Sequence, residues 1–265
     1  MAARRDQRPE AVRPGPWWLQ ESNGEEPYIA LSPGGCYGTG SAYALRLVSA
    51  RGVVVITADG HARRFASIRA PGLIDGIAFD TTGAFGHRLL VTINAGSSTT
   101  VDAIDCGGGV HTITRTAPRI EGGIAVAPAT FGRFAGDLIA SSEDAGRIWA
   151  ITPQGSTHLV ADSGLPHGGD VGVESEAFIP PRPGEDALLA DRLTPGNPHP
   201  GDDLVLRLRA SALRATGARP GDLLVATEGG ARTIDVRCAA TCTVRYVAAG
   251  PAIAHAEGHI VFASS

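Results

Sequence analysis

Short apolar runs separated by turn-forming residues recur along the whole chain. Residues 55–66 and 150–161 share one outline: an apolar run, a turn that contains glycine, and a second apolar run. Residues 101–114 and 233–247 follow the same outline. Paired short runs of this kind predict β-hairpins. The chain has 35 Gly and 18 Pro and lacks a long 3.6-residue period, which favours an all-β fold with many tight turns.

An acidic residue leads another kind of apolar run at four places, namely Asp75, Glu121, Glu174 and Glu257. A second apolar run follows each of the first three acids. It starts with leucine and ends in a polar residue, at residues 89–94, 138–143 and 223–228. A hairpin follows, so each unit has four antiparallel strands. The first three acids are 46 and then 53 residues apart, and four-stranded units of about 40–50 residues indicate the blades of a β-propeller.

The step from Glu174 to Glu257 spans 83 residues, close to the length of two units. It contains an irregular segment at about residues 184–220, which is either a degenerate fifth blade or a long insertion. Within it, residues 210–215, ended by Gly217, predict a short helix. We therefore expect five blades, with six short blades, or four plus an insertion, as alternatives. The chain ends on an acid-led first strand and begins with later strands, so pairing of the N- and C-terminal strands is expected to close the ring.

The length of 265 residues fits a single propeller domain over residues 17–265, after a polar, Arg- and Pro-rich tail at residues 1–16 that is expected to be flexible. This tail has no apolar segment typical of a signal peptide, and both a secreted and a cytoplasmic origin stay open. The apolar runs are too short to span a bilayer, and a net charge of −4 argues against nucleic acid or an anionic membrane as partner. We expect a monomer that binds a small molecule.

Four cysteines leave the redox state open. Cys238 and Cys242 are close enough in sequence to bridge a hairpin, whereas Cys36 and Cys106 have to meet across the fold. An even count fits two disulfides and fits four buried thiols equally well.

Propeller geometry places the acids together. The first strand of a blade lines the central channel and the second runs antiparallel beside it, so the start of one and the end of the other lie on the same face of the disc. The residues expected around this mouth are Asp75, Glu121, Glu174 and Glu257, with Asn94, Glu143 and Glu228 one step outward. Alternation along a strand puts Glu176 on the side of Glu174, and His255 on the side of Glu257.

A ring of carboxylates needs protons, arginines or a cation, because two like charges about 4 Å apart repel by roughly 4 kcal/mol at an effective dielectric near 20. Arg119, Arg147 and Arg192 are near the same elements and allow a structural ring of ion pairs. Ca²⁺, which takes carboxylate and amide oxygens with loose geometry, is the other solution. A third interpretation is that each acid accepts backbone N–H bonds in its own turn.

The repeat style of residues 124–128 and 147–155 resembles that of the SMP-30, gluconolactonase and strictosidine synthase-like β-propeller superfamily. The resemblance covers residues 41–263. It implies a divalent cation, Ca²⁺, at the top of the channel, held by a Glu and by Asn or Asp side chains of the inner strands. In this chain Glu121, Glu174, Glu257 and Asn94 occupy comparable places.

Three functions are consistent with this arrangement. The first is a metal-dependent hydrolase of the lactonase kind, with Glu176 or His255 as the group that moves the proton and Asp75, Glu143, Glu228 and His167 lining the pocket. The second is a non-catalytic propeller that binds a ligand or a protein partner at the same mouth. The third is a lyase or cyclase acting on a natural product. Arg–Glu pairs that fill the mouth favour the second function, and a large apolar pocket over the acids favours the third.

Overall fold

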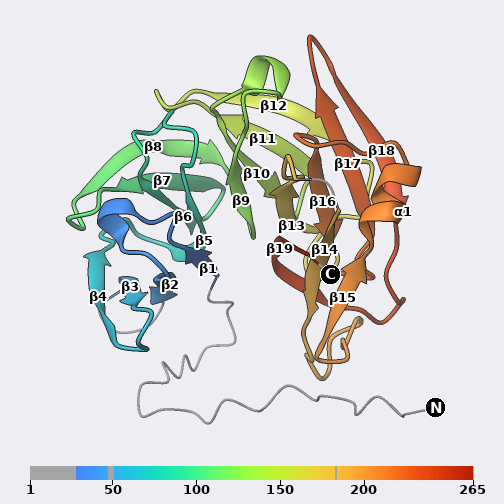
Figure 1. The fold of residues 1–265 in the computed structure, drawn as a ribbon, viewed down its shortest axis with the longest axis horizontal. Coiled ribbons are helices and arrows are strands. Elements are labelled where there is room, and N and C mark those ends of the chain that lie inside the picture. Colours follow the sequence, from blue (N-terminus) through green and yellow to red (C-terminus); the bar gives the residue numbers. More distant parts are fainter. Residues whose placement is uncertain (1–27, 47–50, 183, 265) are drawn as a thin grey trace.

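The expected strands form five antiparallel sheets arranged around a central channel (Figure 1). The computed structural model describes residues 28–46, 51–182 and 184–264. The tail predicted at residues 1–16 lies outside these described residues. None of the described helices is long and apolar enough to cross a membrane.

The first three sheets each take four strands in chain order. The first sheet comprises β1 (Ile29–Leu31), β2 (Ala42–Arg46), β3 (Gly52–Ile56) and β4 (Ala62–Ser67). The second comprises β5 (Leu73–Phe79), β6 (Leu89–Ala95), β7 (Ser98–Ile104) and β8 (Val110–Pro118). The third comprises β9 (Ile124–Val126), β10 (Leu138–Ser142), β11 (Arg147–Ile151) and β12 (Thr157–Asp162). Two 3₁₀ turns, η1 (Gly35–Tyr37) and η2 (Gly132–Phe134), complete this part.

The last two sheets are interleaved along the chain. The fourth comprises β13 (Val173–Phe178), β16 (Leu223–Thr227), β17 (Thr233–Cys238) and β18 (Cys242–Ala248). The fifth comprises β15 (Leu204–Leu208), β14 (Glu185–Asp191) and β19 (Ala256–Ser264), and the predicted helix is α1 (Ala210–Ala215). The irregular segment is thus an insertion between β13 and β16 whose hairpin builds the fifth blade with the C-terminal strand. The prediction of five blades is confirmed.

The predicted closure of the ring by paired terminal strands is wrong within the described residues. β19 pairs with β14, from Glu185 opposite Ser264 to Asp191 opposite Ala256. The first sheet already has its own inner strand, the three-residue β1, so it offers β19 no vacant position. The two ends meet through side chains instead, where the rings of Tyr28 and His259 form an edge contact with centroids 5.3 Å apart.

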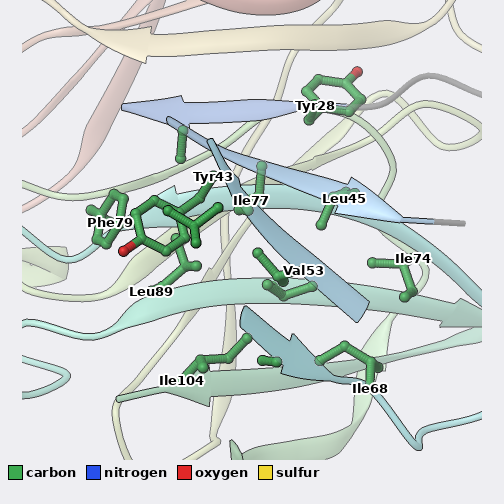
Figure 2. Packing of buried hydrophobic residues seen from close by; sticks show 14 of the residues in the cluster. Tyr28, Tyr43, Leu45, Val53, Ile68, Ile74, Ile77, Phe79, Leu89 and Ile104 are labelled. Carbon is green, nitrogen blue, oxygen red and sulfur yellow. The ribbon is translucent and has the colours of Figure 1, made fainter. Parts of the chain in front are cut away.

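Apolar side chains fill the spaces between adjacent sheets. Between the first two sheets, Tyr43 packs edge-on against Phe65 and Phe79, with ring centroids 4.8 Å and 5.2 Å away. Figure 2 shows Tyr43 beside Phe79 and Leu89, with Ile77 and Leu45 nearby. Offset and edge-to-face aromatic contacts add to the burial of apolar area, so this cluster fixes the first blade against the second.

Both cysteine pairs are disulfides. Cys36–Cys106 joins η1 to the turn after β7, and therefore ties the first sheet to the second across a sequence separation of 70. Cys238–Cys242 closes the turn between β17 and β18, with a separation of only 4.

Candidate functional site at the channel mouth

One cavity of about 340 Å³ lies at the channel mouth, and its lining contains five of the acids singled out in the sequence, Asp75, Glu121, Glu143, Glu174 and Glu228. They come from the second, third and fourth sheets. Tyr28, Arg119 and Asp170 also line it. The structure therefore brings together side chains that are up to 200 positions apart in the chain, from Tyr28 to Glu228.

Backbone hydrogen bonds between neighbouring sheets hold the mouth in shape. The amide of Gly123, which directly precedes β9 of the third sheet, donates to the carbonyl of Glu174 in the fourth at 2.8 Å, and the amide of Ala256 in the fifth sheet donates to the carbonyl of Glu228 at 2.9 Å. Gly122 has a φ of +91°, and a Cβ there would lie 2.4 Å from the carbonyl oxygen of Glu174. Only glycine permits this close approach of the third sheet to the fourth.

The central feature of the mouth is a three-carboxylate cluster of Glu143, Glu174 and Glu228. Each offers one oxygen, these oxygens lie within 4.8 Å of one another, and all three side chains are buried. Burial is the largest cause that raises each pKa, to about 7 for Glu143, about 8 for Glu174 and about 9 for Glu228. Repulsion from neighbouring carboxylates raises them further.

A β-bulge decides which acids of β13 face this cluster. Val173 pairs with Thr227 and Ser175 pairs with Ala226, so Glu174 is the additional residue. A bulge turns its side chain away from the regular alternation. Glu174 lines the mouth, whereas the Oγ of Ser141 donates to Glu176 Oε2 at 2.6 Å. The expectation that both acids lie on one side of a regular strand is therefore wrong.

Glu176 is buried next to the third sheet and is absent from the lining of the mouth. Its Oε1 is buried without a hydrogen-bond partner, and burial raises its pKa to about 8. His167 is exposed, with its Nδ1 3.3 Å from the carbonyl oxygen of Leu165, and it is absent from the lining as well. In its place the following loop contributes Gly169 and Asp170.

His255 connects two acids at the edge of the cluster. Its Nε2 lies 2.9 Å from Glu228 Oε1 and also contacts Glu257 Oε1, and these three residues form a second group of potential metal ligands. On the outer side, Arg192 Nη1 donates to Glu257 Oε2 at 2.8 Å. The predicted proximity of His255 and Glu257 is confirmed.

Asp75 and Asn94 form a separate hydrogen-bonded unit. Asn94 Nδ2 donates to Asp75 Oδ2 at 2.9 Å, the amide of Gly122 donates to the same oxygen at 3.1 Å, and Thr99 Oγ1 donates to Asn94 Oδ1. Burial, followed by the charges of Glu174 and Glu121, raises the pKa of Asp75 well above its usual range. Asn94 thus uses both atoms of its amide group within the protein.

Arginines pair with acids at the rim of the mouth but not with the three-carboxylate cluster at its centre. Arg119 Nη2 lies 2.7 Å from Glu121 Oε2, and its Nε lies 3.4 Å from Asp144. Arg147, which the sequence places near the acids, pairs with Asp162 of β12 instead. No arginine forms an ion pair with the three-carboxylate cluster among the described residues.

Of the four expected metal ligands, only Glu174 belongs to the three-carboxylate cluster. Glu121 is paired with Arg119, Glu257 with His255 and Arg192, and Asn94 with Asp75. The sequence predicts all four at one mouth, but the lining of the cavity contains Glu121 and Glu174 and lacks Asn94 and Glu257. Their partners depend on how neighbouring sheets are packed.

Tyr28 is a residue of the site that the sequence analysis missed. Its hydroxyl donates to Glu174 Oε1 from a position 146 residues earlier, and its ring packs on His259. Burial lowers the pKa of His259 to about 4, so this histidine is neutral in the folded protein. The only sequence signal was one aromatic residue before a three-residue strand, which carries no pattern.

The chain matches no protein-family model and no curated protein. Among solved structures it is similar to a protein of unknown function from Bacteroides caccae, with a TM-score of 0.48 and 16% identity over 87% of this chain and 62% of that one. It is also similar to virginiamycin B lyase from Staphylococcus aureus, with a TM-score of 0.44 and 17% identity over 82% of this chain and 69% of that one. A streptogramin B lyase has a TM-score of 0.42 at 14% identity, over 83% of this chain and 67% of the other. These values carry no conclusion about function.

Proposed function

We propose that the protein is a divalent-cation-dependent hydrolase of small polar substrates, lactones in particular, with its site at the channel mouth. The observation that carries the proposal is the buried cluster of Glu143, Glu174 and Glu228 in an open cavity, without an arginine partner in the described structure. Ca²⁺ is the cation we propose.

The donor set fits a hard cation. Three carboxylates supply only oxygen atoms, and Ca²⁺ takes six to eight oxygen ligands, so positions are left for water and substrate. The same carboxylates have raised pKa values because burial and mutual repulsion oppose their charges. Glu143, Glu174 and Glu228 would hold the cation, which would offset their repulsion and polarise a substrate carbonyl oxygen.

Neighbouring side chains hold the carboxylates of the cluster in position. Tyr28 holds Glu174 from the first sheet, and His255 holds Glu228 from the fifth. His255, like Glu176, is absent from the lining of the cavity. It is the better placed of the two predicted proton carriers because its Nε2 lies 2.9 Å from Glu228 of the cluster, whereas Glu176 is bound by Ser141 of the third sheet. On the rim, Arg119 holds Glu121 and Asp144 beside the cavity through ion pairs.

Calcium is expected to raise the melting temperature of the metal-free protein. A cation that binds only the folded state at a hundredfold excess over its Kd stabilises by about 2.7 kcal/mol, or about 5–10 °C for a chain of this size. Glu174→Gln and Glu228→Gln should remove most of this increase. Glu185→Gln, which changes an acid outside the mouth, should retain it. Thermal unfolding with calcium and with chelator measures both effects, and an unchanged melting temperature in the wild type contradicts cation binding.

Hydrolysis is tested separately, by release of acid from a panel of small lactones. We expect turnover with calcium, loss of turnover in chelator, and loss in His255→Gln with the calcium-induced stabilisation retained. Stabilisation by calcium without turnover of any lactone supports the second function, a non-catalytic propeller that binds a ligand at its mouth. The Arg119–Glu121 and Arg192–Glu257 pairs on the rim favour that second candidate.

A further inference from the structure

A second cavity, of about 760 Å³, lies between β4 and β8 and shares no lining residue with the acidic mouth. These strands are the outer strands of the first and second sheets, at the periphery of the ring (Figure 1). We call this cavity the arginine groove, since Arg64, Arg69 and Arg115 line it.

The walls of the arginine groove are held in place by links between the two sheets. A Cβ on Gly108, in the turn before β8, would lie 2.4 Å from the carbonyl oxygen of Phe65 on β4, so the two backbones are in direct contact. Two residues earlier, Cys106 is joined to Cys36. The hydroxyl of Tyr37 donates to the carbonyl of Ile104 at 2.7 Å. The groove is therefore preformed, which lowers the entropic cost of binding.

The charges of the groove are not satisfied within the described protein. Arg64, Arg69 and Arg115 are exposed, and none of them forms an ion pair with a described acid. Arg115 reaches only Thr112 Oγ1, at 3.3 Å. Three guanidinium groups on one concave surface favour an anionic ligand, because each offers paired donors to a carboxylate or phosphate.

The lining also contains one buried acid, Asp102, which is 2% exposed. Its Oδ1 accepts a hydrogen bond from Thr112 Oγ1 at 2.8 Å, and no described arginine lies within ion-pair distance of it. The Asp102 carboxylate can accept hydrogen bonds, and the three arginines can bind a negative group. The groove therefore suits a ligand that carries hydroxyl groups beside its negative group. Phe65 adds an apolar surface to the same lining.

We propose that the arginine groove binds a small hydroxylated anion, namely a sugar acid or a sugar phosphate. The arginines bind its carboxylate or phosphate, Asp102 accepts from its hydroxyls, and Phe65 contacts its apolar ring face. This binding site is independent of the cation and of the chemistry at the channel mouth.

Calorimetric titrations of the full chain in EDTA test the proposal, since the chelator keeps anions from binding through a metal at the mouth. The probes are D-glucuronate, glucose 6-phosphate, neutral glucose and inorganic phosphate. At least one of the first two should bind, and glucose and inorganic phosphate should bind at least about tenfold more weakly. Binding of glucuronate alone identifies a carboxylate ligand, and binding of glucose 6-phosphate alone identifies a phosphate ligand.

Substitutions of the groove residues test whether the sugar anion binds there. Arg64→Gln, Arg69→Gln and Arg115→Gln together should weaken it by about tenfold or more, whereas Arg214→Gln, an exposed arginine of α1, should leave it unchanged. Asp102→Asn should weaken sugar binding without changing the response to phosphate, and circular dichroism confirms that each variant is folded. The proposal is overturned if neither sugar anion binds, if the triple variant binds as the wild type does, or if inorganic phosphate matches glucose 6-phosphate.

Discussion

In the absence of divalent cations, the free energy of unfolding should decrease as the pH rises from about 5 to about 9. Glu143, Glu174, Glu176 and Glu228 have pKa values raised from 4.5 to between about 7 and about 9 in the folded protein. The folded state therefore keeps protons that the unfolded state has already released. The free energy of unfolding is therefore highest below about pH 4.5, the pKa of these glutamates in the unfolded chain. It decreases as the pH rises toward their pKa values in the folded protein, between about 7 and about 9.

The size of this effect is several kcal/mol, because each retained proton contributes about 1.4 kcal/mol per pH unit. Urea unfolding at about pH 6 and about pH 8.5, in chelator, measures it. Calcium should stabilise more at the higher pH, since it binds the deprotonated carboxylates.

A matched variant separates two sources of the pH dependence. Glu176→Gln removes one buried carboxyl that lies outside the mouth, so it should reduce the slope and leave the calcium effect intact. Glu174→Gln should reduce both. A free energy of unfolding that is constant over this pH range in chelator would falsify the electrostatic account of the mouth.

Removal of the Cys36–Cys106 disulfide should destabilise the protein by about 4 kcal/mol, a value that follows from the loop-closure entropy of the unfolded chain for a separation of 70. The double variant Cys36→Ser, Cys106→Ser should accordingly melt about 8–15 °C lower than the wild type. The bond joins two blades, so its loss also releases one wall of the arginine groove.

The second disulfide is the control. Cys238–Cys242 closes a loop with a separation of only 4, and its replacement by two serines should cost about 2 kcal/mol. Chemical denaturation of the two double variants gives the comparison. Equal losses would show that loop length does not govern these disulfides.

The fold could be predicted from the sequence to a large extent. Asp75, Glu121 and Glu174 mark successive units because the strand pattern and its spacing are local properties of the chain. The closure of the ring could not be predicted, because the three residues of β1 are too short a run to be recognised as an inner strand. The place of the hairpin β14–β15 could not be predicted either, because its neighbour in the sheet is β19, at the far end of the described chain.

The candidate site, too, could be predicted from the sequence only in part. The amino-acid order by itself determined that acidic residues gather at one end of the channel, because each begins an inner strand or ends its neighbour. Only the tertiary structure decided that Glu143, Glu174 and Glu228 form the cluster while Glu121 is bound by Arg119 and Glu176 by Ser141. A bulge in β13 and the lateral packing of the sheets set these partners, and neither leaves a periodic signal in the sequence.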